Sequence, residues 1–242
     1  MADAQVTGNR LSLRKRADQA PRRGRDAESA RQAILAAAEE AFANQGFDGA
    51  RVDAIAEASG YNKALLFHYF GDKLGLYREV VFMCRDETEG CIGEMLLAAA
   101  GDPNIPLDRA RVQAFVEQVS GWMFDHFTAH PRVLHIFAWE IASGWESFLA
   151  AKRADPHAFR WVGPALDFIR RAQEQDIIHR DLDPKMVIMH IMSMTTIYLL
   201  SIPRYEMIFP GEALTTPDSM THAREQMIRL AVHAVMTSPQ EN

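Results

Sequence analysis

Apolar side chains recur three and four positions apart along most of this 242-residue chain, which is the spacing of one face of an α-helix. Val112, Val116 and Val119 begin one such stripe, which continues to Phe127 and is unusually wide and aromatic. No segment shows convincing alternation of apolar and polar residues, as a half-buried strand would, and no internal repeat is found. The pattern predicts an all-α protein of nine or ten helices.

Glycine, proline and short polar side chains mark where the predicted helices begin and end. Ser29 and Gln32 have the spacing of a capping box at the start of the first helix, and Gly46 ends it. No proline occurs between Pro21 and Pro103, which suits uninterrupted helices across that stretch. After the first three helices, the predicted ranges are 72–99, 106–129, 131–144, 145–154, 159–175, 184–201 and 218–236.

Residues 50–73 have the pattern of two short helices joined by a tight turn, followed by the start of a third. Gly60 suits the left-handed conformation that closes a helix, and Asn62 can cap the next helix by accepting a free backbone N–H. Leu66 and Phe70, four positions apart, form the buried face of that second helix. Two helices joined by a short turn that contains glycine are the signature of a helix-turn-helix. The outer face is left to Lys63, Ala64, Phe67 and His68.

These residues resemble the TetR family of bacterial transcriptional regulators, over a stretch from about residue 31 to residue 77. The resemblance rests on the runs IAEASG from Ile55 and LFHYF from Leu66, together with Lys63 and Lys73. It is far more specific than a bare helix-turn-helix pattern. The chain departs from the usual family residues at Arg51, Tyr61, Asn62 and Phe67. The asparagine keeps the capping chemistry, the arginine cannot cap but can reach a phosphate, and the phenylalanine lacks a hydroxyl that in the family can bond the DNA backbone.

The resemblance implies a three-helix DNA-binding domain over residues 28–75 and a helical domain for effector binding and dimerisation over residues 76–242. It also implies a homodimer that places two recognition helices in successive major grooves of double-stranded operator DNA. In the family's pattern Lys63, Ala64 and Leu65 face base edges, and the later positions lie near the DNA backbone. The candidate DNA-binding residues are Arg51, Asn62, Lys63, Ala64, Leu65, Phe67, His68, Tyr69 and Lys73.

Residues 1–27 form a polar, basic segment with too few apolar residues to pack, which predicts a disordered tail in isolation. Its charges sum to +4, whereas those of residues 28–80 sum to −3, an unusual balance for a DNA-binding unit. Two interpretations of the tail stay open. It is either an arm that contacts DNA phosphates or the minor groove, or a solvated passenger.

Composition narrows the class of protein further. The formal net charge is −6 and the sequence pI about 5.8, but whole-chain charge says little about a local DNA-binding surface. The N-terminus lacks the apolar core of a signal peptide. The apolar run 186–202 is short and broken by polar residues, so we expect a core or interface helix and a cytoplasmic protein. Cys84 and Cys91 are seven apart on one predicted helix, roughly 10 Å, which is too far for a disulfide.

Catalysis has no visible support, because the chain contains no GxSxG motif, phosphate-binding loop or dinucleotide fingerprint. We therefore predict that the protein is not an enzyme and needs no cofactor. His126 and His130, together with His135 and Glu140, could in principle ligate zinc. Pro131 places His135 on another helix, however, so no metal site is predicted.

The resemblance also implies a small-molecule pocket in the C-terminal domain, and helical domains build such pockets from aromatic side chains between helices. Few charges and many methionines in this region favour an apolar or aromatic effector. The candidate ligand-binding residues are Trp122, Phe127, Trp139 and Trp145. The last two long helices are expected to form a four-helix dimer interface. Its candidate residues are Val187, His190, Ile191, Met194, Tyr198, Met227, Leu230, Ala231 and Ala234.

These observations predict a sequence-specific DNA-binding transcriptional regulator, foremost a repressor that a small apolar or aromatic effector releases from its operator. The alternative is an all-α small-molecule-binding or enzymatic protein whose helix-turn-helix is purely structural. The sequence leaves open the operator sequence, the effector, the regulated genes and the choice between repressor and activator.

Overall fold

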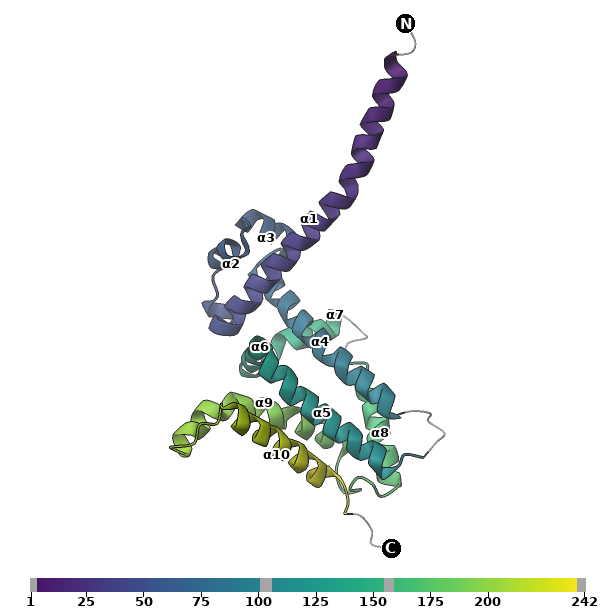
Figure 1. Cartoon of the computed structure of the whole chain (residues 1–242), viewed down its shortest axis with the longest axis vertical. Coiled ribbons are helices and arrows are strands. Elements are labelled where there is room, and N and C mark those ends of the chain that lie inside the picture. The colour runs from purple at the N-terminus through teal and green to yellow at the C-terminus, as the bar shows by residue number, and fades with distance from the viewer. Residues whose placement is uncertain (1–3, 101–105, 155–158, 239–242) are drawn as a thin grey trace. The chain divides into compact units, whose positions relative to one another are not determined.

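The computed structural model describes the backbone of residues 4–100, 106–154 and 159–238, and the side chains from residue 26 onward except at 148, 151, 152 and 154. Within these ranges the prediction of an all-α fold is confirmed, since the sole β-type pairing is an isolated bridge between Ile178 and Met236. The helices, labelled in Figure 1, are α1 (Ala4–Gly49), α2 (Val52–Ser59), α3 (Lys63–Phe70), α4 (Lys73–Ala100), α5 (Arg109–Ala129), α6 (Pro131–Ala142), α7 (Glu146–Ala154), α8 (Val162–Glu174), α9 (Pro184–Ile208) and α10 (Pro217–Val235).

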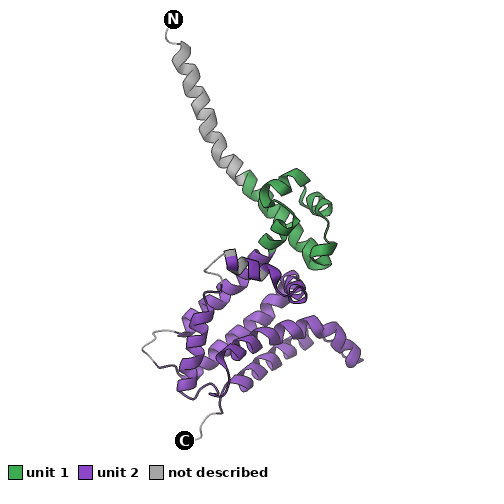
Figure 2. Ribbon diagram, turned by 180° about the vertical axis from the view of Figure 1, so that it is seen from behind, with its two compact units in different colours: residues 1–80 green, residues 81–242 purple. Residues whose placement is uncertain are grey.

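The chain divides into two compact units, Met1–Val80 and Val81–Asn242, which Figure 2 colours separately. The division falls within α4, five residues beyond the boundary expected at residue 75. Unit 1 includes the start of α4 because Tyr77 packs edge-on against Phe42, with ring centroids 5.0 Å apart, and Glu79 forms an ion pair with Arg31 of α1. The first two turns of α4 are therefore part of the core of unit 1.

Unit 1 is built from α1, α2, α3 and the start of α4, with α1 packed against both of the shorter helices. Its core consists of apolar side chains that are almost completely buried: Ile34, Phe42, Ile55, Leu66 and Leu76. Ala38 of α1 is also fully buried, and such small side chains let the helices approach closely. This core fixes the orientation of α3, whose outer face carries most of the predicted DNA contacts.

The first helix differs from its predicted start. Gly46 does end the regular part of α1, because its φ of 68° is left-handed. Ser29, however, lies inside α1 and does not cap it, and the amide of Gln32 donates to the carboxylate of Glu28. α1 as described begins at Ala4, and the expected boundary near residue 27 between a disordered tail and the first helix stays a prediction. The side chains of residues 1–25 lie outside the described part of the chain.

Unit 2 is organised around α5, against which α6, α9 and α10 pack, while α8 packs on α9 and α7 on α6 (Figure 1). Val112, Val116 and Met123 of α5 are buried, as is Phe168 of α8. The carboxylate of Asp125 on α5 accepts hydrogen bonds of 2.7 and 2.8 Å from the guanidinium of Arg224 on α10. Such bidentate pairs have a fixed geometry, so this one sets the register between α5 and α10.

The predicted end of α9 at residue 201 was wrong. The helix continues through Pro203 to Ile208. Proline removes one backbone donor from a helix interior but need not end the helix when its surroundings hold it in place. By length and composition α9 is apolar enough to cross a membrane, a test that core helices of soluble proteins also pass.

Candidate nucleic-acid interface and ligand cavity

The turn between α2 and α3 has the local geometry that its sequence predicts. Gly60 adopts a φ of 76° and closes α2, and the N–H of Tyr61 donates to the carbonyl of Ala56 at 3.1 Å. The Leu65 N–H donates to Asn62 Oδ1 at 2.8 Å, which confirms Asn62 as the cap of α3. Arg51 precedes α2 without capping it, as expected. These caps hold α3 at a fixed angle to α2.

The two faces of α3 divide as the sequence predicts. Leu66 is fully buried and Phe70 is buried, so this edge of the helix anchors it in unit 1. Leu65 and Tyr69 are half-buried at the margins. The exposed face presents Lys63, Ala64, Phe67 and His68, and Arg51 and Asn62 are exposed beside it. An exposed face of this kind, on a helix that is locked by its opposite face, suits insertion into the DNA major groove.

Lys63 has a partner that sequence reasoning missed. Its ammonium lies 2.9 Å from the carboxylate of Asp53 on α2 and 5.8 Å from the ring centroid of Phe67. Both charged side chains are about half exposed or more, so the pair contributes only about 0.2–1 kcal/mol to the stability of the fold. The acidic residue ten positions earlier is the signal in the sequence, but only the angle between α2 and α3 shows that the two side chains meet.

Lys73 is held at the start of α4. Its ammonium donates to the backbone oxygen of Asp48 at 3.3 Å and lies 4.8 Å from the centroid of the Phe47 ring. Asp72 caps the same helix by accepting the N–H of Gly75 at 2.7 Å, as the sequence predicts. The cation therefore stands beside a helix N-terminus, where backbone dipoles also favour a phosphate.

Unit 2 contains adjoining cavities along α4. One, of about 300 Å³, has an almost entirely apolar lining, which includes Phe137, Trp145, Trp161 and Met192. A second, of about 630 Å³, is more polar and shares Arg85, Glu89 and Trp161 with the first. Apolar concavities with a few polar groups are typical small-molecule sites.

Arg85 lines both cavities and supplies a polar group to them. The whole residue is 6% exposed, and its Nε donates to the carboxylate of Asp86 at 2.7 Å. Its Nη1 is buried and has no hydrogen-bond partner among the described residues. A buried, unpaired donor is costly, about 1–3 kcal/mol or more for a charged group, unless another group accepts its hydrogen bond. A ligand with an acceptor oxygen would remove this cost.

Comparison with known proteins bears on both parts of the site. The family model for bacterial regulatory proteins of the TetR family matches residues 34–80, and that for the tetracyclin repressor-like C-terminal domain matches residues 113–231. Together these matches span both units and more than two thirds of the chain. The chain belongs to the TetR family.

Curated relatives and solved structures agree with this assignment. The chain is 24% identical over 209 residues to the HTH-type transcriptional repressor SCO4008 of Streptomyces coelicolor, a match that covers 86% of this chain and 97% of that one. It is 41% identical over 80 residues to the repressor AcnR of Corynebacterium glutamicum, covering 31% and 43% of the two chains. The crystal structure of SCO4942 from S. coelicolor matches with a TM-score of 0.61 at 25% identity, covering 88% of this chain and 99% of that one. This TetR-family protein is therefore a helix-turn-helix transcriptional regulator and not an enzyme.

The structure places the four predicted ligand-binding residues of this TetR-family protein differently. Trp145 lines the 300 Å³ cavity. Phe127 is buried behind it, with its ring 5.7 Å from that of Phe137, which does line the cavity. Trp122 stacks on His126 and Trp139 is 41% exposed, and neither lines this cavity. The lining residues that were missed are Arg85, Thr88, Glu89, Ile92, Phe137, Leu149, Phe159, Trp161 and Met192.

The predicted dimer residues also separate into two groups. Val187 and Ala231 are buried within unit 2, and Ile191 faces an inner cavity beside Phe115 and Phe168. In the single chain these three side chains therefore face the interior of unit 2, and their predicted role in the dimer interface stays a prediction. An outer groove between α9 and α10 is lined by others of the set, His190, Met194, Tyr198, Met227 and Leu230, and Ala234 is exposed further along α10.

Proposed function

We propose that this protein is a cytoplasmic, homodimeric repressor that binds operator DNA through α3 and that a small molecule releases. The observation that carries the proposal is the exposed face of α3, held by the Asn62 cap and the buried Leu66. The relatives named above are repressors, which supports the same sign of regulation here. The alternative of a purely structural helix-turn-helix is not favoured.

Within this proposal Lys63, Ala64 and Leu65 face base edges in the major groove. A lysine can donate to guanine O6 or N7, and a leucine can contact a thymine methyl group. Contacts to the DNA backbone come from the remaining members of the set. They are Arg51, Phe67, His68, Tyr69 and Lys73, with Asn62 serving as the cap.

The partner that covers the outer face of α9 and α10 is a second copy of the chain. Exposed large apolar side chains gather there, including Met186, Met189, Ile197 and Leu230. A contiguous apolar surface of this kind marks an interaction site in a soluble protein. TetR-family regulators are typically dimeric, and a two-fold axis at this groove would assemble α9 and α10 of both subunits into one bundle.

The effector is proposed to have an apolar body and one acidic group. The apolar lining of the 300 Å³ cavity fits the body, and the unpaired Nη1 of Arg85 fits a carboxylate or a similar anion. Arg85 lies on α4, the helix that also carries Lys73. A ligand that prefers one position of this helix would shift the protein away from its DNA-bound state.

The test begins with genomic DNA fragments that the full-length protein selects, because genes beside them suggest candidate ligands. Hydrophobic carboxylic acids and their methyl esters are then compared as releasing agents in a DNA retardation assay. We expect each acid to release DNA at a concentration at least tenfold below its ester, and Arg85→Met to abolish that difference. Failure to retain any genomic fragment would refute the DNA-binding role. Equal potency of acid and ester on the unmodified protein would refute the role of Arg85 alone.

A further inference from the structure

We infer that Glu87 of α4 and the two histidines His126 and His130 at the end of α5 form a binding site for a divalent transition metal, best matched by zinc. Each of the three side chains offers a ligand atom, and these atoms all lie within 4.8 Å of one another. Two imidazoles and one carboxylate are a common zinc donor set. A tetrahedral zinc ion places its ligand atoms about 3.3 Å apart, so modest side-chain rotation would close the site.

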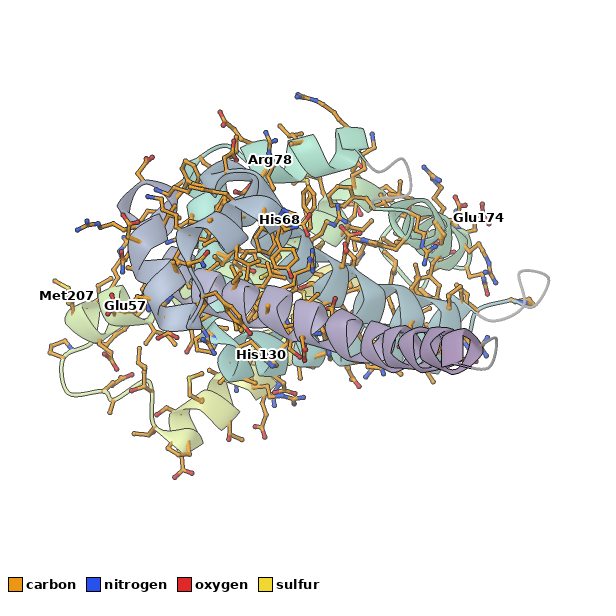
Figure 3. The ribbon with its side chains drawn as sticks, turned by 90° about the horizontal axis from the view of Figure 1, so that it is seen from above. Glu57, His68, Arg78, His130, Glu174 and Met207 are labelled. Carbon is orange, nitrogen blue, oxygen red and sulfur yellow. The ribbon has the colours of Figure 1, made fainter. Side chains whose placement is uncertain are left out.

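His130 is already oriented as a metal ligand. Its Nδ1 lies 3.0 Å from the backbone oxygen of His126. A carbonyl oxygen can only accept, so Nδ1 carries the proton and donates it, and Nε2 keeps its lone pair for a metal. Metal-bound histidines commonly have their second ring nitrogen tied to a carbonyl in this way, which fixes the tautomer and the ring direction. His130, labelled in Figure 3, is exposed, so the ion can approach from solvent.

His126 provides the independent observation. The residue is only 7% exposed, and its Nε2 is buried without a hydrogen-bond partner in the described part of the chain. Its ring stacks on Trp122 with centroids 4.7 Å apart and lies 4.7 Å from the ring of His130. A metal ion bound at this Nε2 would supply the partner that the buried atom lacks in the described part of the chain.

The ligand set that the sequence suggested is not the one that the structure brings together. Glu140 is buried and accepts the Ser147 N–H at 3.2 Å, and His135 is exposed on α6. Glu87 replaces them from α4, thirty-nine residues before His126. Imidazole nitrogens favour zinc, copper, nickel or cobalt over magnesium and calcium. Three protein ligands leave a fourth position for water.

The consequence is a link between two helices of unit 2. Glu87 lies on α4 and the histidines on α5, so a bound ion would tie the helix that lines the ligand cavity to the centre of the unit. Metal binding should therefore raise the temperature of unfolding as well as occupy the site, because an ion that binds only the folded state stabilises it. All three proposed ligands lie in unit 2, so metal binding does not depend on the DNA-binding role of unit 1.

The test uses the full-length protein after treatment with a chelator. Zinc binding is measured by competition with a chromophoric chelator, and cobalt(II) serves as a visible probe of tetrahedral coordination. We expect one ion per chain in the micromolar range or tighter, with intense cobalt absorption. His130→Gln and Glu87→Gln change exposed residues, so folding should survive, and each should weaken binding at least tenfold.

The control is His135→Gln. His135 is also an exposed histidine, on α6, and it lies outside the three-residue cluster. It should leave zinc affinity unchanged. The inference is overturned if the protein takes up less than a fifth of an ion per chain. It is also overturned if His130→Gln binds zinc as tightly as the unmodified chain, since the ion would then occupy adventitious surface histidines or the cysteines.

Discussion

The ion pair between Lys63 and Asp53 predicts that a conservative change on α2 will tighten operator binding. Lys63 is one of the proposed base-contacting residues, and its ammonium is 2.9 Å from the carboxylate of Asp53. To reach a base edge it must leave or share this carboxylate. Asp53→Asn keeps the size of the side chain while removing the competing charge.

The expected size follows from the exposure of the pair. Half-exposed pairs contribute about 0.2–1 kcal/mol, so releasing Lys63 should raise operator affinity by a factor of about 1.4 to 5. Lys63→Ala acts in the opposite direction, because one good base contact is worth about 1–3 kcal/mol of discrimination. It should weaken operator binding by about 5- to 150-fold and affect random DNA little.

Fluorescence anisotropy on operator and random duplexes at fixed salt measures both effects, and a double-mutant cycle separates them. The gain from Asp53→Asn should largely disappear in the Lys63→Ala background. Glu57→Gln is the control, since it removes the same charge from an exposed position one turn later on α2 (Figure 3 labels Glu57). Equal gains from Asp53→Asn in both backgrounds, matched by Glu57→Gln, would refute the reasoning. The change would then reflect general repulsion of phosphates.

Four further predictions follow from the same geometry. Asn62→Ala removes the cap of α3 and should lower the free energy of unfolding by about 1 kcal/mol, with a parallel loss of operator affinity, as measured by thermal melts and anisotropy. Met194→Glu places a charge in the apolar groove of α9 and α10 and should give monomers in sedimentation; a dimer at micromolar concentration would move the interface elsewhere. Deletion of residues 1–25 should flatten the salt dependence, by about 0.9 in the log–log slope for each DNA phosphate that the tail neutralises, and an unchanged slope would identify the tail as a passenger. Gly90→Ala should stabilise α4 by about 0.5–1 kcal/mol in denaturant titration, since a Cβ there meets no atom within 4 Å, and a decrease in stability would contradict that packing.

The helix-turn-helix could be predicted from sequence because its determinants are local. Gly60, Asn62 and Asp72 act on backbone groups within a few residues. Their spacing in the sequence therefore determines where the helices end and begin. The pairing of Lys63 with Asp53 could not be predicted from the sequence, because it depends on the angle between two helices. That angle is set by buried contacts rather than by either residue.

The residues that line the 300 Å³ cavity were harder to predict from the sequence, because their direction depends on how the helices pack. An aromatic residue on a helix can face the core, a cavity or solvent, and small rotations of the helix decide between them. Trp139 lies on α6 and Trp145 in the turn before α7, where its backbone is left-handed, and the two have similar exposure, yet only Trp145 lines the cavity. Similarly, Val187 and Met194 share one helical stripe, but that stripe is wide enough to span both the core of the subunit and the outer groove.

If the effector and DNA exclude each other, the effector must bind the released state with a minimum preference in free energy, and this sets a minimum apolar area for the ligand. α4 carries Lys73, which belongs to unit 1, and Arg85, which lines the cavity of unit 2, so one helix contributes to both proposed sites. A near-complete switch needs a preference for the released state of about 5.5 kcal/mol. A charged hydrogen bond to Arg85 supplies about 1.5–3 kcal/mol even if it forms in that state alone. The remaining 2.5–4 kcal/mol, roughly, corresponds to about 100–160 Å² of additional apolar burial. A small polar anion cannot provide that area, so an effective ligand must combine its acidic group with a substantial hydrocarbon or aromatic body.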